Sequence, residues 1–452
     1  MSRRRTAAIV LAAGHGTRMK SSMPKVMHPL AGRPMLRHIL ATLGHAGIND
    51  ICVVVGPDMG DVREIAQPYA TAVQTERLGT AHAALAAKDA IPPDIDDLLI
   101  LNGDNPLIPA ASIEALLARR AGADNPAVVV LGFRSSSTHA YGRLVVSDDG
   151  TLYRIVEARD ADPEEFAIDL CSSGMMALDG ASGFEMLAEI ENDNAQGEYY
   201  LPDIVHAARE RDRVCTFVEG PEADLLGINS RAELATAEAR IQQHLRADAM
   251  AGGATLIAPE TVFFSFDTKI GRDVVIEPNV VIGPGVEIAD GVTIRAFSHL
   301  EGATVGTGAT VGPFARLRPG ANLAENVHIG NFVEVKNANI GEGAKANHLS
   351  YVGDSDVGAG ANIGAGTITC NYDGVFKWRT TIGEGAFIGS NTSLVAPVTV
   401  GPGAVTGAGS TIAKDVAADA LAVTRAPQKE LKDWGRQTRE RKLALKAKGE
   451  KG

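Results

Sequence analysis

The stretch TKIGRDVVIEPNVVIGPGVEIADGVTI, residues 268–294, places an isoleucine at every sixth position: Ile270, Ile276, Ile282, Ile288 and Ile294. Similar blocks continue to Ile412, with slips of one residue near Leu300 and Ile340. A period of six fits neither a helix nor an alternating strand. It fits a chain that turns a corner after each short strand and stacks one aliphatic side chain per side. The sequence therefore predicts a parallel β-helix whose aliphatic column is core and not a binding site.

The first half of the chain, to about Asn229, has a different pattern. Short aliphatic segments (7–11, 50–55, 97–101 and 127–131) alternate with helix-like segments (35–43, 79–87 and 112–121). This alternation predicts a mostly parallel sheet covered on both faces, with ligands at the carboxyl ends of its strands. Residues 231–249 lack Gly and Pro and predict one long connecting helix, whereas the basic tail after Pro427 is expected to be helical or disordered and solvated.

The composition restricts the classes of function. The chain has 452 residues, a net charge of −12, 45% apolar and 22% charged residues. This size predicts at least two domains with a large core, and the acidic balance argues against general nucleic-acid binding. No apolar stretch reaches membrane-spanning length. The four cysteines form no C-x-x-C pair, so we expect neither a zinc site nor a disulfide framework, and a reducing cytoplasm is the simplest setting.

A candidate phosphate loop follows the first expected strand. Residues 11–19 read LAAGHGTRM, and Pro24-Lys25 comes shortly after. The glycines allow backbone N–H groups to approach phosphate oxygens, and Arg18 and Lys25 can neutralise a triphosphate and a departing pyrophosphate. The third glycine of a dinucleotide fingerprint and the G-K-[ST] of a P-loop are both absent. The basic residues beyond the glycines favour a functional loop over a plain tight turn.

Two further stretches are expected beside this loop. Asn102-Gly103-Asp104 ends another strand, where a carboxylate beside phosphates suits Mg²⁺, although the same residues also form ordinary turns. The position at a strand end favours the metal interpretation. Residues 74–80 (QTERLGT) supply amide and backbone groups that suit a pyrimidine edge, although by composition they are an ordinary helix start.

A second candidate site interrupts the repeats with polar residues that a β-helix does not need, at 316–320, 331–336, 347–351, 362–367 and 369–374. The imidazole of His348 could take a proton from an amine, with Glu334 to orient it. Arg318 and Lys336 could hold a phosphate. A thioester is open to direct attack by an amine, so Cys370 is expected to be a bystander and not a nucleophile.

The string L-x-x-G-x-G-T-R-[ML]…P-K resembles the signature of sugar-nucleotide pyrophosphorylases. With the polar cluster of the repeats, the chain from Thr6 to about Pro427 resembles the bacterial bifunctional N-acetylglucosamine-1-phosphate uridyltransferase / glucosamine-1-phosphate acetyltransferase family. The resemblance implies an α/β plus all-β protein. It comprises a Rossmann-like nucleotidyltransferase domain (1–229), a helical linker (230–251), a left-handed parallel β-helix acetyltransferase domain (252–425) and a basic tail (426–452). It also implies a homotrimer with acetyl-CoA sites between subunits.

The resemblance implies roles for individual residues. In the uridyl site, Leu11, Ala12, Ala13, Gly14, Arg18 and Lys25 would surround the nucleotide, and Gln74, Gly79 and Thr80 would read the uridine. Asp104 and Asn229 would hold Mg²⁺, and Gly142, Glu157 and Asn229 would contact the sugar. In the repeats, His348 would be the base, and Arg318, Lys336, Tyr351 and Asn362 would bind the sugar phosphate. Near the coenzyme and acetyl group would lie Ala365, Asn371, Tyr372, Ser390, Ala408 and Arg425.

Two residues of the uridyl site depart from the family pattern. Asn102 stands where the family often has Tyr, and Ser172, in Ser172-Ser173-Gly174, stands where it often has Asn. Serine has a shorter reach and one fewer donor than asparagine. This puts the sugar contact of Ser172 in question and favours one through water.

The expected function is two successive reactions. Glucosamine-1-phosphate would be acetylated with acetyl-CoA, and the N-acetylglucosamine-1-phosphate formed would take uridylyl from UTP and release pyrophosphate. The product, UDP-N-acetylglucosamine, would feed cell-wall and outer-membrane sugar synthesis. One alternative is a pyrophosphorylase whose β-helix only assembles subunits; another is a non-catalytic interaction protein. The polar cluster disfavours the first, and the presence together of Arg18, Lys25, Asp104 and His348 disfavours the second.

Overall fold

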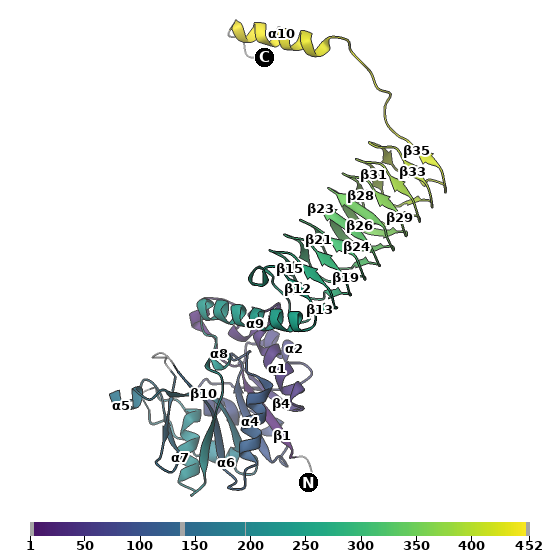
Figure 1. Ribbon diagram of the computed structural model, residues 1–452. Helices are drawn as coiled ribbons and strands as arrows, with labels where there is room; N and C mark the ends of the chain where they lie inside the picture. The colour runs from purple at the N-terminus through teal and green to yellow at the C-terminus, as the bar shows by residue number, and fades with distance from the viewer. Residues whose placement is uncertain (1–3, 136–140, 195, 449–452) are drawn as a thin grey trace. The chain divides into compact units, whose positions relative to one another are not determined.

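The computed structural model describes residues 4–135, 141–194 and 196–448. They form two compact units: Met1–Asp248 with Phe264–Phe266, and Ala249–Phe263 with Asp267–Gly452. The first is an α/β unit and the second a β-helix, as the pattern change in the sequence predicts (Figure 1).

The first unit contains a nine-stranded mixed sheet, in which seven strands have the order β11-β7-β10-β6-β1-β4-β5. These strands are β1 (Thr6–Leu11), β4 (Asp50–Val55), β5 (Ala70–Val73), β6 (Asp97–Asn102), β7 (Val128–Arg134), β10 (Leu170–Asp179) and β11 (Cys215–Glu219). The remaining two, β8 (Arg143–Val146) and β9 (Leu152–Val156), are attached beside β10. Strand β10 runs antiparallel to β6 and β7, and the other pairs along the main order are parallel. All four expected strands are therefore confirmed.

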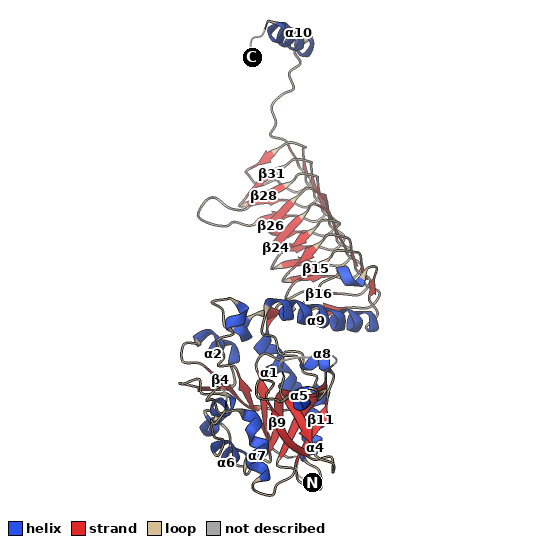
Figure 2. Ribbon diagram, turned by 90° about the vertical axis from the view of Figure 1, so that its left-hand side faces the viewer, coloured by secondary structure: helices blue, strands red, loops and turns tan. Residues whose placement is uncertain are grey.

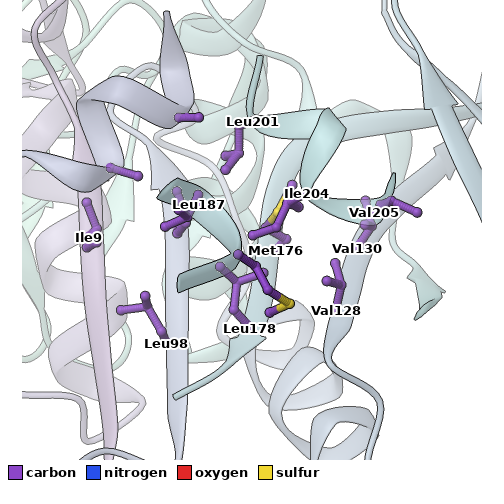
Figure 3. Close-up of a cluster of buried hydrophobic side chains, with 14 of the residues drawn as sticks. Ile9, Leu98, Val128, Val130, Met176, Leu178, Leu187, Leu201, Ile204 and Val205 are labelled. Carbon is purple, nitrogen blue, oxygen red and sulfur yellow. The ribbon is translucent and has the colours of Figure 1, made fainter. Parts of the chain in front are cut away.

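Helices cover both faces of this sheet, because alternate side chains of each strand point to opposite sides. Ile9 belongs to one buried cluster and its neighbours Ala8 and Val10 to the other. Figure 3 shows the first cluster, in which Ile9 and Met176 lie among other aliphatic side chains. The helices are α1 (Met35–His45), α2 (Gly60–Ala66), α3 (Thr80–Leu85), α4 (Ala110–Arg120), α5 (Pro163–Phe166), α6 (Gly183–Ala188), α7 (Ile204–Arg209), α8 (Glu222–Leu225) and α9 (Arg231–Ala251). This unit also contains a short pair, β2 (Pro29–Leu30) and β3 (Arg33–Pro34), and the 3₁₀ turns η1 (Thr17–Met19), η2 (Lys25–Met27), η3 (Lys88–Ala90) and η4 (Leu201–Asp203). A further 3₁₀ turn, η5 (Pro259–Thr261), belongs to the second unit.

The register of β1 and β6 brings the two expected chemical loops together. Leu11 pairs with Asn102 at the carboxyl ends of these parallel strands. The Gly103 N–H donates to the Leu11 carbonyl at 2.8 Å. A Cβ on Gly103 would lie 2.8 Å from that same oxygen, so a larger residue would push the loops apart.

The second unit is a parallel β-helix. Its first sheet contains β12 (Thr255–Leu256), β14 (Val275–Ile276), β17 (Thr293–Ile294), β20 (Thr310–Val311), β23 (His328–Asn331), β25 (Lys345–His348), β27 (Asn362–Ile363), β30 (Phe387–Ile388), β33 (Val405–Thr406) and β35 (Leu421–Ala422). The remaining strands are β13 (Lys269–Ile270), β15 (Val281–Ile282), β16 (Glu287–Ile288), β18 (His299–Leu300), β19 (Ala303–Val305), β21 (Arg316–Leu317), β22 (Ala321–Leu323), β24 (Glu334–Ile340), β26 (Tyr351–Val357), β28 (Ile368–Cys370), β29 (Thr380–Ile382), β31 (Ser393–Val395), β32 (Val398–Val400) and β34 (Thr411–Ile412).

The strand register explains the period of six. Ile276 pairs with Ile294, so one coil takes eighteen residues, or three sides of six. Leu300 pairs with Leu317, and Ile340 with Val357, at a separation of seventeen, which accounts for the slips in the repeat. The column is buried as predicted, except that Ile270 near its start is half-buried.

A long loop, residues 371–379, interrupts the coils between β28 and β29 and projects from the β-helix (Figure 2). After β35 the tail forms the exposed helix α10 (Trp434–Ala447). Of the helices in the described ranges, none combines the length and apolar character needed to cross a membrane.

Candidate active sites

The first candidate site, called here the sheet pocket, is a cavity of about 460 Å³ at the carboxyl ends of β1 and β6. Fourteen of the fifteen residues expected in the uridyl site line it, and Arg18 does not; the fourteen are Leu11, Ala12, Ala13, Gly14, Lys25, Gln74, Gly79, Thr80, Asn102, Asp104, Gly142, Glu157, Ser172 and Asn229. They come from segments spread over more than two hundred positions, and the fold collects them in one cavity.

Lys25 lies at the centre of the charged groups of this pocket. Its Nζ forms an ion pair with Asp104 Oδ2 and donates to Asn229 Oδ1 at 2.9 Å. Two oxygens from distant loops therefore converge on one cation. No cluster of three or more His, Cys, Asp or Glu side chains suited to a metal occurs within residues 4–135, 141–194 and 196–448. One carboxylate and one amide oxygen still fit Mg²⁺, because this ion keeps several waters and binds substrate phosphates.

The loop before Lys25 depends on Gly16. This residue has φ +65°, and a Cβ there would lie 2.5 Å from Lys25 Cβ. Glycine thus permits both the left-handed turn and the close approach of Lys25. Arg18 follows on η1; its side chain is exposed and does not line the cavity.

The opposite end of the sheet pocket is built from 74–80. Gln74 is buried, and its Nε2 donates to the Gly79 carbonyl at 3.0 Å. Gly79 has φ +116°, and a Cβ would overlap the backbone of Tyr199. Thr80 Oγ1 accepts from the Leu201 N–H at 3.0 Å. The first of these bonds fixes the side chain of Gln74, and the second joins the 74–80 segment to Leu201.

Sequence reasoning gave no role to three other residues of the pocket wall. Arg77 Nε donates to the Ala13 carbonyl at 2.9 Å, and Asn105 Nδ2 donates to the Leu225 carbonyl at 2.6 Å. The Tyr141 hydroxyl accepts from the Gly227 N–H at 3.0 Å, and burial raises the pKa of Tyr141. Each ties one pocket loop to another through backbone atoms. Arg77 falls inside the 74–80 stretch and Tyr141 directly precedes Gly142, but nothing in the pattern singled them out.

The two departures from the family pattern lie side by side. Asn102 Nδ2 donates to the Ser173 carbonyl at 3.3 Å, and a Cβ on Gly174 would lie 2.7 Å from the same nitrogen. Ser172 Oγ accepts from the Gly174 N–H at 3.1 Å, so its own O–H remains a donor. Elsewhere in the pocket, burial and the nearby charges of Asp160 and Asp203 raise the pKa of Glu157.

The second candidate site, called here the His348 cluster, lies on adjacent coils of the β-helix. Asn331 and His348 are register partners, and His348 Nδ1 lies 2.7 Å from Asn331 Oδ1. Glu334, expected to orient His348, instead accepts from Arg318 Nη1 at 2.7 Å. The structure thus assigns Asn331, not Glu334, as the hydrogen-bond partner of the imidazole.

The other residues expected to bind the sugar phosphate lie on the same or adjacent coils of the β-helix. Tyr351 is the register partner of Glu334, and Lys336 is that of Gly353. Asn362 pairs with Lys345 on the strand that ends at His348. Arg318, Lys336, Tyr351 and Asn362 are all half-buried, which suits groups that meet a ligand.

The residues expected near the coenzyme follow successive coils away from His348. The Gly366 N–H donates to the His348 carbonyl at 3.3 Å, the Asn391 N–H to the Ala365 carbonyl at 2.7 Å, and the Gly409 N–H to the Ser390 carbonyl at 2.8 Å. Arg425 Nη1 donates to the Ala408 carbonyl at 2.9 Å. Ala365, Ser390, Ala408 and Arg425 therefore mark one line along the β-helix. Asn371 and Tyr372 begin the projecting loop, where Asp373 accepts from the Val375 and Phe376 N–H groups and from Trp378 Nε1.

Beside His348 runs an exposed apolar line, called here the aromatic ridge: Phe297, Phe314, Phe332 and Leu349. The phenyl rings stack with centroids 4.9 Å and 5.2 Å apart. All four residues have positive φ, between 50° and 61°. Such dihedrals are unfavourable for large side chains. The chain therefore maintains four strained, exposed apolar residues at one corner.

Comparison with known proteins gives two matches to domain families. A MobA-like NTP transferase domain matches residues 8–163, and the bacterial transferase hexapeptide (six repeats) matches 267–302 and 379–414. The hexapeptide match confirms the left-handed parallel β-helix expected from the sequence. A protein of Paramagnetospirillum magneticum is 58% identical over 448 residues, which cover 99% of this chain and all of that one. A protein of Rhodospirillum rubrum is 58% identical, covering 87% and 88% of the two chains, and one of Gluconobacter oxydans is 53% identical, covering 88% of each. Each bears the name "Bifunctional protein GlmU".

Proposed function

The chain belongs to the GlmU family of bifunctional enzymes, and we propose that it makes UDP-N-acetylglucosamine by acetyl transfer followed by uridyl transfer. We assign uridyl transfer to residues 1–229, acetyl transfer to 252–425, and a linking role to the helix between them. The observation that supports this most strongly is the convergence of fourteen of the fifteen expected uridyl-site residues on the sheet pocket. The tail from 426 receives no catalytic role.

In the sheet pocket, the phosphate of N-acetylglucosamine-1-phosphate attacks the α-phosphorus of UTP, and pyrophosphate leaves. Backbone N–H groups of the loop after Leu11, with Arg18 and Lys25, stabilise the negative charge that develops on the phosphates. Gln74, Gly79 and Thr80 hold the uracil edge, whereas Gly142 and Glu157 hold the sugar. Asp104 and Asn229 would hold Mg²⁺, which when bound offsets phosphate charge and orients the oxygens. The convergence of both oxygens on Lys25 Nζ supports that assignment.

In the His348 cluster, the amine of glucosamine-1-phosphate attacks the thioester carbonyl of acetyl-CoA. When Nδ1–H donates to Asn331 Oδ1, the lone pair of His348 Nε2 is free to accept the amine proton. Backbone N–H groups near Ala365 stabilise the oxyanion, and the carbon–sulfur bond then breaks to release coenzyme A. Arg318 and Lys336, with Tyr351 and Asn362, bind the sugar phosphate. Ala365, Asn371, Tyr372, Ser390, Ala408 and Arg425 bind acetyl-CoA.

We further propose that the chain acts as a homotrimer. The aromatic ridge is exposed in one chain, and contiguous apolar surface of this kind is typical of protein interfaces. Phe332 follows Asn331, and Leu349 follows His348. A second copy of the chain that covers the ridge would therefore also enclose the imidazole. The proposed setting is a reducing cytoplasm, which is in keeping with four unpaired thiols.

The test is a pair of assays on the purified full-length chain. One measures pyrophosphate release from UTP with N-acetylglucosamine-1-phosphate, and the other thiol release from acetyl-CoA with glucosamine-1-phosphate. Both products are expected. Pyrophosphate without thiol would favour a pyrophosphorylase with an assembling β-helix, and neither product would favour a non-catalytic protein.

A further inference from the structure

Asp354 is a buried carboxylate of the β-helix to which the reaction described above gives no role. It lies on β26 with 6% of its surface exposed and has φ +47°. Ionised side chains are rarely this buried unless they are paired or hydrogen-bonded. Its partners therefore indicate why it is there.

Two amides on the neighbouring coils donate to Asp354. Asn337 Nδ2 donates to Oδ1 at 2.5 Å, and Asn371 Nδ2 donates to Oδ2. Each amide is seventeen residues away, so the three side chains occupy the same position on successive coils. Burial alone would raise the pKa of Asp354, but these hydrogen bonds and the charges of Lys336 and Lys377 hold that pKa below its usual value. The group is thus a carboxylate that only accepts hydrogen bonds.

An acceptor-only partner fixes how each amide is turned. Asn371 has to direct its NH₂ group, and not its oxygen, toward Asp354. The same nitrogen lies 3.3 Å from the Tyr351 hydroxyl oxygen and donates to it. Asn371 Oδ1 accepts nothing from the described part of the chain, and because the Tyr351 oxygen acts as an acceptor, its O–H is left to donate.

Tyr351 is also held in place from below. A Cβ on Gly353 would overlap the Tyr351 hydroxyl, so the ring lies directly over this glycine. The Gly353 N–H donates to Thr369 Oγ1 at 2.8 Å, which fixes the backbone under the ring. The hydroxyl thus has one well-defined position beside Asn371.

We propose that Asp354 is a positioning residue for acetyl transfer, which sets the direction of hydrogen bonding at Asn371 and Tyr351. The Asn371 oxygen then accepts from an N–H group of the acetyl donor, and the Tyr351 hydroxyl donates to the anionic sugar phosphate. This inference rests on the proposed function of the His348 cluster. It adds a residue that touches neither substrate.

The chain supplies a matched control two residues further along the same strand. Asp356 accepts from Asn339 Nδ2 at 2.7 Å and pairs with Arg379 at 2.6 Å. It is therefore also a carboxylate bonded to an asparagine seventeen residues earlier, but its partners belong to neither candidate site. Asp356→Asn removes a comparable charge from the same strand.

The experiment compares Asp354→Asn with Asp356→Asn in the full-length chain. Asparagine tolerates positive φ and has the shape of aspartate, so D354N should fold. D354N replaces the charged acceptor of two hydrogen bonds by a neutral one, and hydrogen bonds to charged groups are stronger than neutral ones. We therefore expect kcat/KM for acetyl transfer to fall about 10- to 100-fold in D354N, mainly through higher KM for both substrates. Uridyl transfer by D354N, and both reactions of D356N, should stay within about twofold of the unmodified chain. The mass of the assembly should not change in either variant.

A double-mutant cycle separates positioning from general support of the fold. In an Asn371→Ala background, D354N should lower acetyl transfer by much less than it does alone, because its main intermediary is gone. Additive losses, or equal losses in D354N and D356N, would overturn the inference. If the unmodified chain lacks acetyl transfer altogether, the proposed function fails first; if it is active and D354N is unimpaired, only the role of Asp354 fails.

Discussion

The partner of His348 gives a sharp test of the acetyl-transfer site. Asn331 Oδ1 lies 2.7 Å from His348 Nδ1, whereas Glu334 is engaged with Arg318. Asn331→Ala removes the group that fixes the ring, and Glu334→Gln removes only the charge beside Arg318. The two variants therefore distinguish the contact seen in the structure from the one expected from the sequence.

The size of each effect follows from these contacts. A neutral hydrogen bond at an exposed site contributes about 1 kcal/mol, so Asn331→Ala should lower kcat for acetyl transfer roughly five- to tenfold. This is far less than loss of the base itself, which would lower the rate by about 10²- to 10⁴-fold. Glu334→Gln should leave kcat unchanged and raise KM for glucosamine-1-phosphate roughly two- to fivefold, because a partly exposed ion pair is weak.

The assay is thiol release from acetyl-CoA at varied sugar phosphate, with uridyl transfer by the same preparations as the internal control. Unchanged uridyl transfer shows that the first unit of each variant is folded, and an unchanged mass of the assembly by light scattering shows that its β-helix still assembles. A large loss of kcat in Glu334→Gln, with Asn331→Ala unimpaired, would show that Glu334, and not Asn331, orients His348.

Three further outcomes follow from the sheet pocket and the aromatic ridge. Because burial raises the pKa of Glu157, its ionised form destabilises the folded state at pH values above the ordinary pKa of 4.5. Glu157→Gln should therefore raise Tm at pH 7, lose this gain below about pH 4, and impair uridyl transfer. An unchanged Tm at pH 7 would contradict the effect of burial on this carboxyl. Chelation of divalent ions should stop pyrophosphate release and leave thiol release intact; survival of both would remove the metal from Asp104 and Asn229. Phe314→Glu should reduce the mass measured by light scattering below that of a trimer and lower acetyl transfer with it, because a charge would replace a stacked ring on the ridge; an intact trimer would show that the ridge is not the interface.

The fold could be predicted because both of its repeating patterns are local. The six-residue spacing requires three sides per coil, and the structure confirms both the buried column and the slips near Leu300 and Ile340. Strand β4 has the expected bounds, and β1 and β6 differ from expectation by one residue at one end. The antiparallel strand β10 was not expected. Its direction relative to β6 and β7 is decided by pairing across the sheet and not by its own sequence.

The lining of the sheet pocket could be predicted from the sequence, whereas the hydrogen bonds that hold the pocket and the His348 cluster together could not. Short motifs at strand ends located the walls of the sheet pocket. The contacts of Tyr141 and Arg77 were not predicted because their partners are backbone groups, which almost any residue supplies. The roles of Asn331 and Asp354 were not predicted because their partners are seventeen residues away in the sequence. That separation places two residues in contact only when one coil of the β-helix takes seventeen residues.

The most direct test of the central claim, that two independent sites share this chain, is to measure both reactions in His348→Ala and in Lys25→Ala. We expect His348→Ala to lose acetyl transfer by about 10²-fold or more and to keep uridyl transfer, and Lys25→Ala to do the reverse. If either variant, folded and of unchanged mass, loses both reactions to the same degree, the chain does not contain two independent sites.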